Sequence, residues 1–391
     1  MKQRDKTRLV HMARKPQEAE SEAVNPAIVR ASTVLYKDMA AFHAIRGRRE
    51  KNERVFSYGS RGTPTTFALE DAITEIEQGT RTNLFSTGLA AIAHVFLSIL
   101  KTGDHVLLSE SIYGPARAIA TRYLAPRGIE CEYYPGGHEE IAKRLKPNTR
   151  MIYLEIPGSI VYDLQDLPAI AELVKGKDIL IAADNTWGAP GLYRPLALGA
   201  DISIIAITKY IAGHSDLMMG SVTAKGKIAE QLSFDAGLFG QTVSSDDAYT
   251  ALRGLRTASA RIAMHVAHAA EVIKWLQQQP QVEKVLYPAL PSHPGHEIWK
   301  RDFTGTNGLL SVAFKKPITQ DQVDHVAESL KLFGLGASWG GYESLAMVYP
   351  AGGIKGWNGG ALIRLHIGLE DPADIIADLG QAFSTLPSSA A

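Results

Sequence analysis

The middle of the chain alternates short apolar runs with helix-like patterns, and this alternation restricts the possible folds more than any other feature. Between about residues 63 and 225, runs typical of buried strands are separated by segments whose apolar residues recur every three or four positions. Such alternation is typical of β-α units in a mostly parallel sheet. We therefore predict an α/β domain with strands at 105–109, 151–155, 179–183 and 202–207.

Two helices are predicted within this region. One begins near Pro64, directly after Thr63, and stops at Gly79. The other begins near Gly88, and its apolar residues recur at helical spacing through Ile99. Each is expected to end in a turn that contains glycine.

The last third of the chain has a different pattern. Apolar residues three or four apart between about 258 and 279, followed by Pro280, predict a long amphipathic helix. After it come apolar runs at 308–314 and 362–367, with a helical pattern at 319–330 between them. This order predicts a smaller α+β domain.

We divide the chain into an N-terminal arm (1–60), a large α/β domain (61–255) and a C-terminal α+β domain (256–391). The first segment is rich in charge and poor in periodicity, so we expect an extended arm that wraps a partner subunit.

The charge balance and the cysteine content exclude several classes of protein. The 391 residues include 41 Lys and Arg and 41 Asp and Glu, so no overall field attracts nucleic acid or an anionic membrane. Cys131 is the single cysteine, which excludes an internal disulfide and favours a reducing compartment. The first 20 residues lack the apolar stretch of a secretory signal, and the most apolar segment, 84–100, falls short of a membrane helix. We expect a soluble cytoplasmic protein that binds neither nucleic acid nor a membrane.

Two predicted strands lead into residues of opposite charge. The run 179–183 is followed by Asp184, and the run 202–207 is followed by Thr208 and Lys209. Ligands of open α/β sheets bind outside the carboxyl ends of the strands. A lysine there more often returns to solvent and an aspartate more often caps a turn. Together, however, they match pyridoxal phosphate, which needs a lysine for a Schiff base and an acid for its ring nitrogen.

A third segment offers an anion site. The sequence Ser86-Thr87-Gly88-Leu89 follows a short apolar run and opens a predicted helix. The backbone N–H groups of Gly88 and Leu89 are therefore candidates for binding a phosphate, although the same pattern also describes a helix cap without a ligand.

Six motifs are spread along almost the whole chain. They are YGSRGTPT (58–65), STG (86–88), DNTW (184–187), TKYIAGHSD (208–216), SWGGYES (338–344) and RLHIGLE (364–370). In this order, over about residues 30 to 385, they resemble the Cys/Met-metabolism family of pyridoxal phosphate enzymes. The resemblance implies an aspartate aminotransferase-like fold (the PLP-dependent transferase fold, fold type I), pyridoxal 5'-phosphate as cofactor, no metal, and a homotetramer with shared active sites.

The resemblance also implies roles for individual residues. Lys209 is implied to form the Schiff base and then to move protons, Asp184 to pair with the pyridine nitrogen, and Tyr113 to stack on the ring. The implied phosphate-binding positions are Gly88, Leu89, Thr208 and, from the neighbouring subunit, Tyr58. The implied substrate-binding positions are Arg61 for the distal end, Arg364 for the α-carboxylate, and Ser338 and Trp339 along the side.

Two positions depart from the family pattern. Ser60 stands where the family usually has an arginine bound to the cofactor phosphate, so either Arg61 takes over that contact or the phosphate is bound more weakly, with the distal substrate role of Arg61 favoured. Ala206 stands where many members have a phosphate-binding serine. Both departures concern the affinity for the cofactor rather than the type of reaction.

The resemblance implies a carbon-sulfur lyase. The expected reaction is β-elimination of the thioether L-cystathionine to homocysteine, pyruvate and ammonia, a step of methionine biosynthesis. Trp339 favours β-elimination, because family members that act at the γ-carbon usually have leucine there. The indole is expected to restrict reach to the γ-carbon.

Other functions stay open at this point. Within the same family they are a cystathionine γ-lyase or γ-synthase and a β-lyase of cystine or other cysteine S-conjugates. A non-catalytic cofactor-binding protein is another class. A metal-binding protein is a further one, because His265 and His268, and likewise His293 and His296, are spaced three apart.

Overall fold

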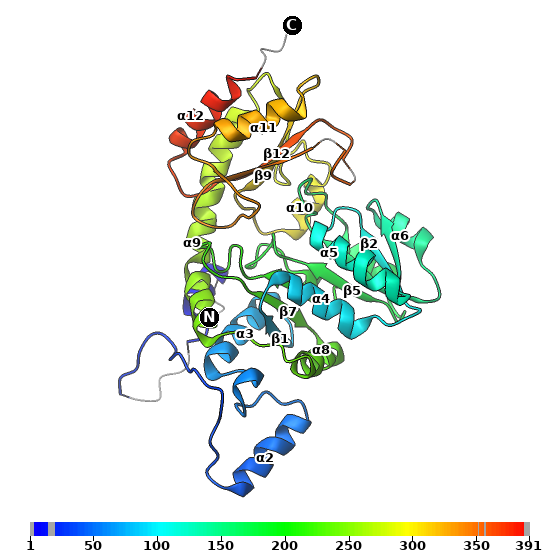
Figure 1. Cartoon of the computed structure of the whole chain (residues 1–391), viewed down its shortest axis with the longest axis vertical. Helices are drawn as coiled ribbons and strands as arrows, with labels where there is room; N and C mark the ends of the chain where they lie inside the picture. Colours follow the sequence, from blue (N-terminus) through cyan, green and yellow to red (C-terminus); the bar gives the residue numbers. More distant parts are fainter. Residues whose placement is uncertain (1–3, 15–19, 351, 356, 387–391) are drawn as a thin grey trace.

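The computed structural model describes residues 4–14, 20–350, 352–355 and 357–386, and it contains two sheets that lie one above the other in Figure 1. The larger sheet has seven strands in the order β1-β7-β6-β5-β4-β2-β3. In that order, the strands span Arg81–Phe85, Gly220–Ala224, Ile202–Ala206, Leu180–Asp184, Thr149–Glu155, His105–Ser109 and Glu130–Tyr134. The strands from β6 to β3 are parallel, and β7 runs antiparallel to both of its neighbours.

Helices cover both faces of this sheet. They are α3 (Pro64–Glu77), α4 (Gly88–Ile99), α5 (Gly114–Ile119), α6 (His138–Arg144), α7 (Leu167–Val174) and α8 (Gly226–Leu238). Short turns of other helix types occur at η1 (Gly59–Arg61), η2 (Ala120–Leu124), η3 (Ala125–Arg127) and η4 (Pro195–Leu198). The strands are buried on both sides, which explains why they read as continuous apolar runs.

Two helix starts are capped as the sequence predicts. The Thr63 side chain and the N–H and side chain of Thr66 form a reciprocal capping box, with Pro64 as the first residue of α3. The Thr87 hydroxyl accepts a hydrogen bond from the N–H of Ala90 at the start of α4.

The smaller sheet has five strands in the order β10-β11-β12-β9-β8. These strands span Gly334–Leu335, Leu345–Tyr349, Leu362–His366, Leu309–Phe314 and Val282–Leu286. Helices α10 (His296–Asp302), α11 (Gln320–Ser329) and α12 (Pro372–Phe383) accompany it. A separate apolar core lies between this sheet, α11, α12 and the end of α9.

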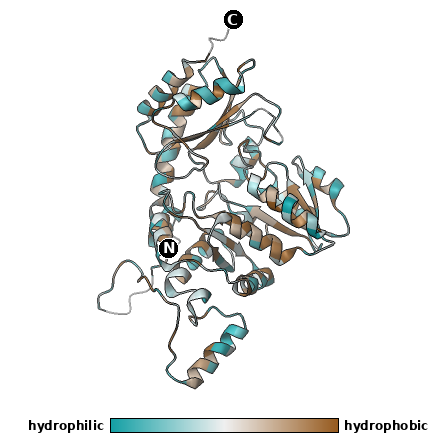
Figure 2. Ribbon diagram, viewed as in Figure 1, coloured by the Kyte–Doolittle hydropathy of each residue, from teal (hydrophilic) through white to brown (hydrophobic). Residues whose placement is uncertain are grey.

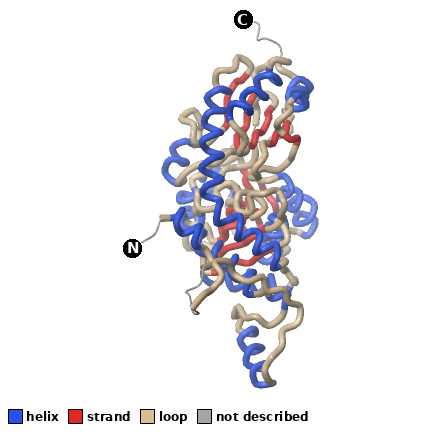
Figure 3. Tube along the Cα trace, turned by 90° about the vertical axis from the view of Figure 1, so that its left-hand side faces the viewer, coloured by secondary structure: helices blue, strands red, loops and turns tan. Residues whose placement is uncertain are grey.

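Helix α9 (Ser245–Leu276) connects the two parts and runs alongside both, as the turned view shows (Figure 3). The 258–279 prediction found this helix but placed its start too late. Its first turn carries Asp246 and Asp247 and is capped by Ser244, and buried apolar residues already recur at helical spacing from Ala248 through Leu255, before the predicted start. The boundary placed at 255 falls inside α9, and the division into domains stays a proposal.

The arm predicted as extended contains two helices, which corrects that expectation. Helix α1 (Asp5–His11) packs on α9, with Leu9 and Met12 buried. Helix α2 (Met39–Glu50) has no buried residue and projects away from the large sheet in Figure 1. Figure 2 shows that its first half is apolar and its second half polar. The apolar side chains of α2 are therefore not packed into either hydrophobic core of this chain.

The remaining predicted elements agree with the structure. The strand at 105–109 matches β2 at both ends, and the strands at 151–155, 179–183 and 202–207 match β4, β5 and β6 to within two residues. Among the described residues, no helix is both long and apolar enough to span a membrane.

Candidate active site

The Lys209 amine lies where the large and small sheets meet. Lys209 follows the end of β6, and its Nζ donates a hydrogen bond to Ser338 Oγ, 2.8 Å away, in the loop before β11. Burial and, to a smaller extent, the positive charge of Arg364 lower the Lys209 pKa to about 8, while the charge of Asp184 acts in the opposite direction. A lysine with such a pKa is neutral in about a tenth of the molecules at pH 7, far more than a lysine with an ordinary pKa.

Asp184 ends the neighbouring strand β5 and is only 6% exposed. Its Oδ1 accepts hydrogen bonds from the Thr186 N–H (3.0 Å) and the Thr186 hydroxyl (2.6 Å). Burial raises the pKa of Asp184, and the Thr186 donors and the Lys209 charge counteract that rise. A cationic ring nitrogen placed beside this carboxyl would keep it ionised.

Glu155 is a site residue that the sequence analysis missed. The register between β4 and β5 places it directly opposite Asp184. Its carboxylate accepts hydrogen bonds from the Tyr113 N–H (2.6 Å) and the Ser159 hydroxyl (2.7 Å). Burial, together with the charge of Asp184, raises the pKa of Glu155 well above its usual value. The signal was present, since Glu155 is also the last residue of a predicted strand.

Tyr113, Arg364 and Trp339 complete the surroundings. Tyr113 is 45% exposed. Burial and the charges of Glu155 and Asp184 raise the pKa of its hydroxyl group, and the charge of Arg364 lowers it. Arg364 lies on β12, is 9% exposed, and donates from Nη2 to the Ser338 carbonyl oxygen at 3.3 Å. The Trp339 ring centre is 5.3 Å from Lys209 Nζ. The structure thus brings together six of the predicted residues: Lys209, Asp184, Tyr113, Ser338, Trp339 and Arg364.

The start of α4 supplies a place for an anion next to this group. The N–H groups of Gly88 and Leu89 have no partner within the helix, because no helical carbonyl precedes them by one turn. Thr87 binds the N–H groups of Ala90 and Ala91 that follow. A Cβ on Gly88 would lie 2.6 Å from the Ala206 Cβ at the end of β6, so only glycine fits there. The Thr208 hydroxyl bonds to both backbone groups of Met219.

These residues fit pyridoxal phosphate. Lys209 provides a half-buried amine, Asp184 a buried carboxyl, and α4 a helix N-terminus with free N–H donors. The hydroxyl of buried Tyr153 also lies near Asp184 and helps to hold down the pKa of that carboxyl.

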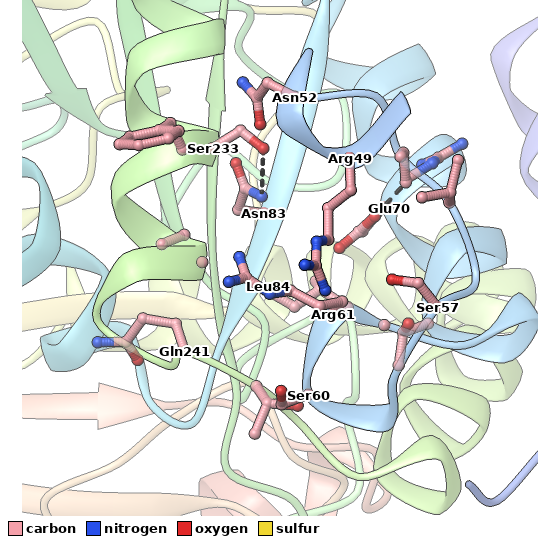
Figure 4. A pocket seen from close by; sticks show the side chains of 18 of the residues that line it. Arg49, Asn52, Ser57, Ser60, Arg61, Glu70, Asn83, Leu84, Ser233 and Gln241 are labelled. Atoms are coloured by element: carbon pink, nitrogen blue, oxygen red, sulfur yellow. Dashed lines mark hydrogen bonds and ion pairs between the residues drawn. The ribbon is translucent and has the colours of Figure 1, made fainter. Parts of the chain in front are cut away.

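Two predicted site residues lie elsewhere in the chain. Tyr58 precedes η1 and is 48% exposed, and Arg61 ends η1. Within the described residues, neither side chain forms a hydrogen bond or an ion pair with the Lys209 site, and Arg61 lines a separate cavity (Figure 4).

The histidines considered as metal ligands bind backbone groups instead. The Nδ1 atoms of His265 and His268 lie 2.8 and 3.3 Å from the carbonyl oxygens of Ile367 and Gly368. Burial lowers the pKa of His265 to about 4, so its ring is neutral. These two residues attach α9 to the end of β12.

In the part of the chain that the structure describes, one group of three potential metal ligands is found, and it contains none of the histidines discussed above. It consists of His105, Glu130 and Glu132 at the sheet edge. The Lys146 ammonium is within 2.6 Å of both glutamates and occupies the cation position itself.

Comparisons with known proteins agree with this geometry. A family model described as Cys/Met metabolism PLP-dependent enzyme matches residues 6–384. Cystathionine beta-lyase of Bordetella avium is 43% identical over 384 residues, covering 96% of both chains. Cystathionine beta-lyase MetC of Escherichia coli K12 is 42% identical and covers 93% of this chain and 94% of the relative. The crystal structure of metB from Corynebacterium glutamicum superposes with a TM-score of 0.89 at 31% identity, covering 98% of this chain and 99% of that one.

Proposed function

The chain belongs to the family of Cys/Met metabolism PLP-dependent enzymes, and from this premise we propose that it cleaves L-cystathionine by β-elimination. The products are homocysteine, pyruvate and ammonia. The observation that carries the proposal is the half-buried Lys209 amine. It donates a hydrogen bond to Ser338, and the charges of Asp184 and Arg364 both affect its pKa. The relatives named cystathionine beta-lyase, at 43% and 42% identity, support the same reaction.

The cofactor is pyridoxal 5'-phosphate, which supplies an electron sink for the carbanion at the substrate α-carbon. Lys209 would hold it covalently, Asp184 would pair with its ring nitrogen and Tyr113 would cover a face of the ring. The N–H groups of Gly88 and Leu89, with Thr208 beside them, would bind the phosphate.

Arg364 orients the substrate. A guanidinium fork binds a carboxylate through two parallel hydrogen bonds, so Arg364 fixes the α-carboxylate in one orientation. Because Arg364 also bonds to the Ser338 carbonyl, it is positioned relative to the residue that holds the Lys209 amine. The α-hydrogen is thereby presented to Nζ.

Lys209 acts as the base. In its neutral form, the Lys209 Nζ would take the α-proton of the bound substrate. The bond between the β-carbon and sulfur then breaks, and the sulfur leaves with the electron pair and gains a proton to become homocysteine. The remaining three-carbon fragment, 2-aminoacrylate, reacts with one water to give pyruvate and ammonia.

Trp339 restricts the reaction to the β-carbon. Its indole lies beside Lys209 Nζ and packs against Tyr210, with ring centres 5.4 Å apart. A ring held in this way fills space that a substrate would need for its γ-carbon to react. This argument favours β-elimination over the γ-lyase and γ-synthase reactions.

The active enzyme is a cytoplasmic homotetramer in this proposal. Large apolar side chains of the arm are exposed in the single chain, with Leu35 at 92%, Val24 at 74% and Met39 at 64%. A second copy that covers them would receive Tyr58 at its cofactor phosphate and Arg61 at the distal end of its substrate. Both residues are free for such a role.

The test is a product analysis. The purified protein is incubated with pyridoxal 5'-phosphate and L-cystathionine, and the keto acid and thiol are identified. Pyruvate with homocysteine is the expected result, and Lys209→Ala should abolish it. If 2-oxobutyrate and cysteine form instead, the enzyme is a γ-lyase and the role given to Trp339 is wrong.

A further inference from the structure

The segment that carries Lys209 forms a single turn whose last carbonyl groups need partners. Within residues 207–213, the Gly213 N–H donates a hydrogen bond to the Lys209 carbonyl oxygen at 2.8 Å, which closes one helix-like turn. The carbonyl groups at the end of such a turn have no partner within it. Those of Tyr210 and Ile211 therefore depend on donors from elsewhere in the chain.

Arg261 on the long helix α9 supplies these donors. Its Nη2 donates hydrogen bonds to the carbonyl oxygens of Tyr210 at 2.9 Å and Ile211 at 3.3 Å. The same nitrogen donates to the carbonyl oxygen of Gly254, which belongs to α9 itself, at 2.7 Å. A single guanidinium group thus connects the Lys209 turn to the helix.

Two glycines bring the turn and the helix into direct contact. A Cβ on Gly254 would lie 2.6 Å from the Ile211 carbonyl oxygen, and a Cβ on Gly213 would overlap the Arg261 guanidinium group. Gly213 also has a φ of +71°, which residues with a Cβ rarely adopt. The turn therefore packs on α9 backbone to backbone.

Arg261 is a buried cation held by neutral groups. It is 8% exposed, and its hydrogen-bond partners are the three carbonyl oxygens and the Thr257 hydroxyl, which is 3.4 Å from Nε. Burial lowers its pKa to about 10, so the group is still charged at neutral pH. Its Nη1 is buried without a hydrogen-bond partner. Burying a charge in this way is costly, and packing alone does not require it.

The same face of α9 also holds the strand that carries Arg364. His265 and His268 contact the carbonyl groups that follow β12, and they come four and seven residues after Arg261. Residues at these intervals lie along one side of a helix. Helix α9, which runs alongside both parts of the molecule (Figure 3), therefore contacts the segment of the proposed base and the strand of the proposed carboxylate-binding arginine.

We propose that Arg261 is a positioning residue: by holding the Lys209 turn to α9, it sets the place of the Lys209 amine relative to Arg364. The inference rests on the roles that the proposed function gives to Lys209 and Arg364. Arg261 acts through the turn and not on the substrate itself. Because a displacement of about 1 Å can cost about a hundredfold in rate, the hold on this turn matters for proton transfer.

The first test is steady-state kinetics of cofactor-loaded variants with cystathionine. Arg261→Gln should lower kcat by about tenfold or more and change KM by less than about threefold, because Arg364 keeps its place on β12. Arg261→Lys keeps the charge but lacks the planar fork, so it should lower kcat by about threefold or more. Arg253→Gln changes an exposed arginine of the same helix and, as the control, should leave kcat within about twofold.

The second test needs no substrate. Borohydride reduction fixes pyridoxal 5'-phosphate to the lysine that holds it, and mass spectrometry then gives the fraction attached to Lys209. At one subsaturating cofactor concentration, Arg261→Gln should lower this fraction by about threefold, because the amine is no longer held in place, and Arg253→Gln should not. Urea unfolding reports stability separately. A merely structural role would lower stability and leave kcat and the attached fraction of the folded protein unchanged.

The proposal is overturned if folded Arg261→Gln keeps both kcat and the attached fraction within about twofold of the unaltered protein, or if the change falls on KM alone. If Arg261→Gln does not fold, the same results with Arg261→Lys overturn it. Failure of the unaltered protein to form pyruvate from cystathionine would contradict the proposed function instead, and the attached fraction would still decide the role of Arg261.

Discussion

Lys209 is the residue whose protonation most directly limits the proposed reaction. Its amine accepts a proton only when neutral, and burial together with Arg364 lowers its pKa to about 8. Falling pH therefore removes the base. We expect the rate at saturating cystathionine to rise with pH and to level off above about pH 8, with about a tenfold lower rate one pH unit below 8 than on the plateau. Steady-state kinetics between pH 6 and 9 measures this, and a flat profile would contradict the assignment of Lys209 as the base.

Trp339 is the residue proposed to determine whether the β-carbon or the γ-carbon of the substrate reacts. Trp339→Leu opens space beside Lys209 Nζ, so we expect the ratio of 2-oxobutyrate to pyruvate to rise by about tenfold, as changes of apolar pocket size usually allow. Trp339→Phe keeps a large ring and serves as the control. Chromatographic quantification of both keto acids decides the matter, and an unchanged ratio in the leucine variant would show that the indole has only a packing role.

Helix α3 contains two buried carboxyl groups, Glu70 and Glu77, that have different partners. Glu77 accepts hydrogen bonds from Ser203 Oγ (2.6 Å) and Asn185 Nδ2 (3.0 Å), and so joins β6 to the residue after Asp184. Glu70 pairs with Arg54 instead. Burial raises the pKa of each to about 7, so each contributes stability that is present below its unfolded pKa near 4.5 and is lost as the pH rises through about 7.

Replacing either residue by glutamine should make stability less dependent on pH. We expect the change in unfolding free energy between pH 5 and pH 8 to shrink by about 2–3 kcal/mol in both Glu77→Gln and Glu70→Gln. Urea unfolding at the two pH values measures it. Only Glu77→Gln should also weaken cofactor binding, because it alone contacts Asn185; equal cofactor affinity in the two variants would deny Glu77 a positioning role.

The contacts between α9 and β12 have the opposite pH dependence. His265 and His366 lie with ring centres 5.0 Å apart, and burial lowers their pKa values to about 4 and about 3. Unfolding lets them take up protons, so the stability they contribute is present above about pH 6.5 and is lost as the pH falls toward 4. His265→Gln should reduce the loss of stability between pH 6.5 and 4 by about 3 kcal/mol, measured by urea unfolding with His268→Gln as control.

The same elements explain how far the sequence could be interpreted alone. Strands β2, β4, β5 and β6 are buried on both faces, so their apolar runs marked them within two residues. Helix α2 gave no periodicity to detect, because none of its residues is buried in this chain. The strand-end rule located Asp184 and Lys209 but was not applied to Glu155, which ends β4 in register with Asp184. Ser338 and Lys209 are 129 residues apart in the sequence. Their contact could not be predicted from the sequence, because it depends on how the small sheet packs against the large one.

At the scale of the whole molecule, the proposed shared site would make activity depend on assembly. Leu35 and Met39 are 92% and 64% exposed, and they precede η1, whose Tyr58 and Arg61 are proposed to complete a neighbour's site. We expect light scattering on the purified protein to give four times the 42.4 kDa chain mass. The double change Leu35→Asp and Met39→Asp should produce smaller species that have lost most of their activity.

Leu332→Asp, on the C-terminal sheet region, is the control for the charge introduced. It should keep both the mass and the activity of the unaltered protein. A monomeric protein with full activity would contradict the shared site, and an unchanged mass in the arm variant would place the contact elsewhere.

The antiparallel strand β7 has a consequence for how the protein is made. Among the described residues, strand β1 pairs with β7 alone, and more than a hundred residues separate the two in the chain. At about 5–20 residues per second, Arg81–Phe85 leaves the ribosome on the order of ten seconds before its partner exists. During that interval its N–H and C=O groups are an open template for other strands. Newly made chains of this protein are therefore expected to need protection by chaperones until Gly220–Ala224 has emerged.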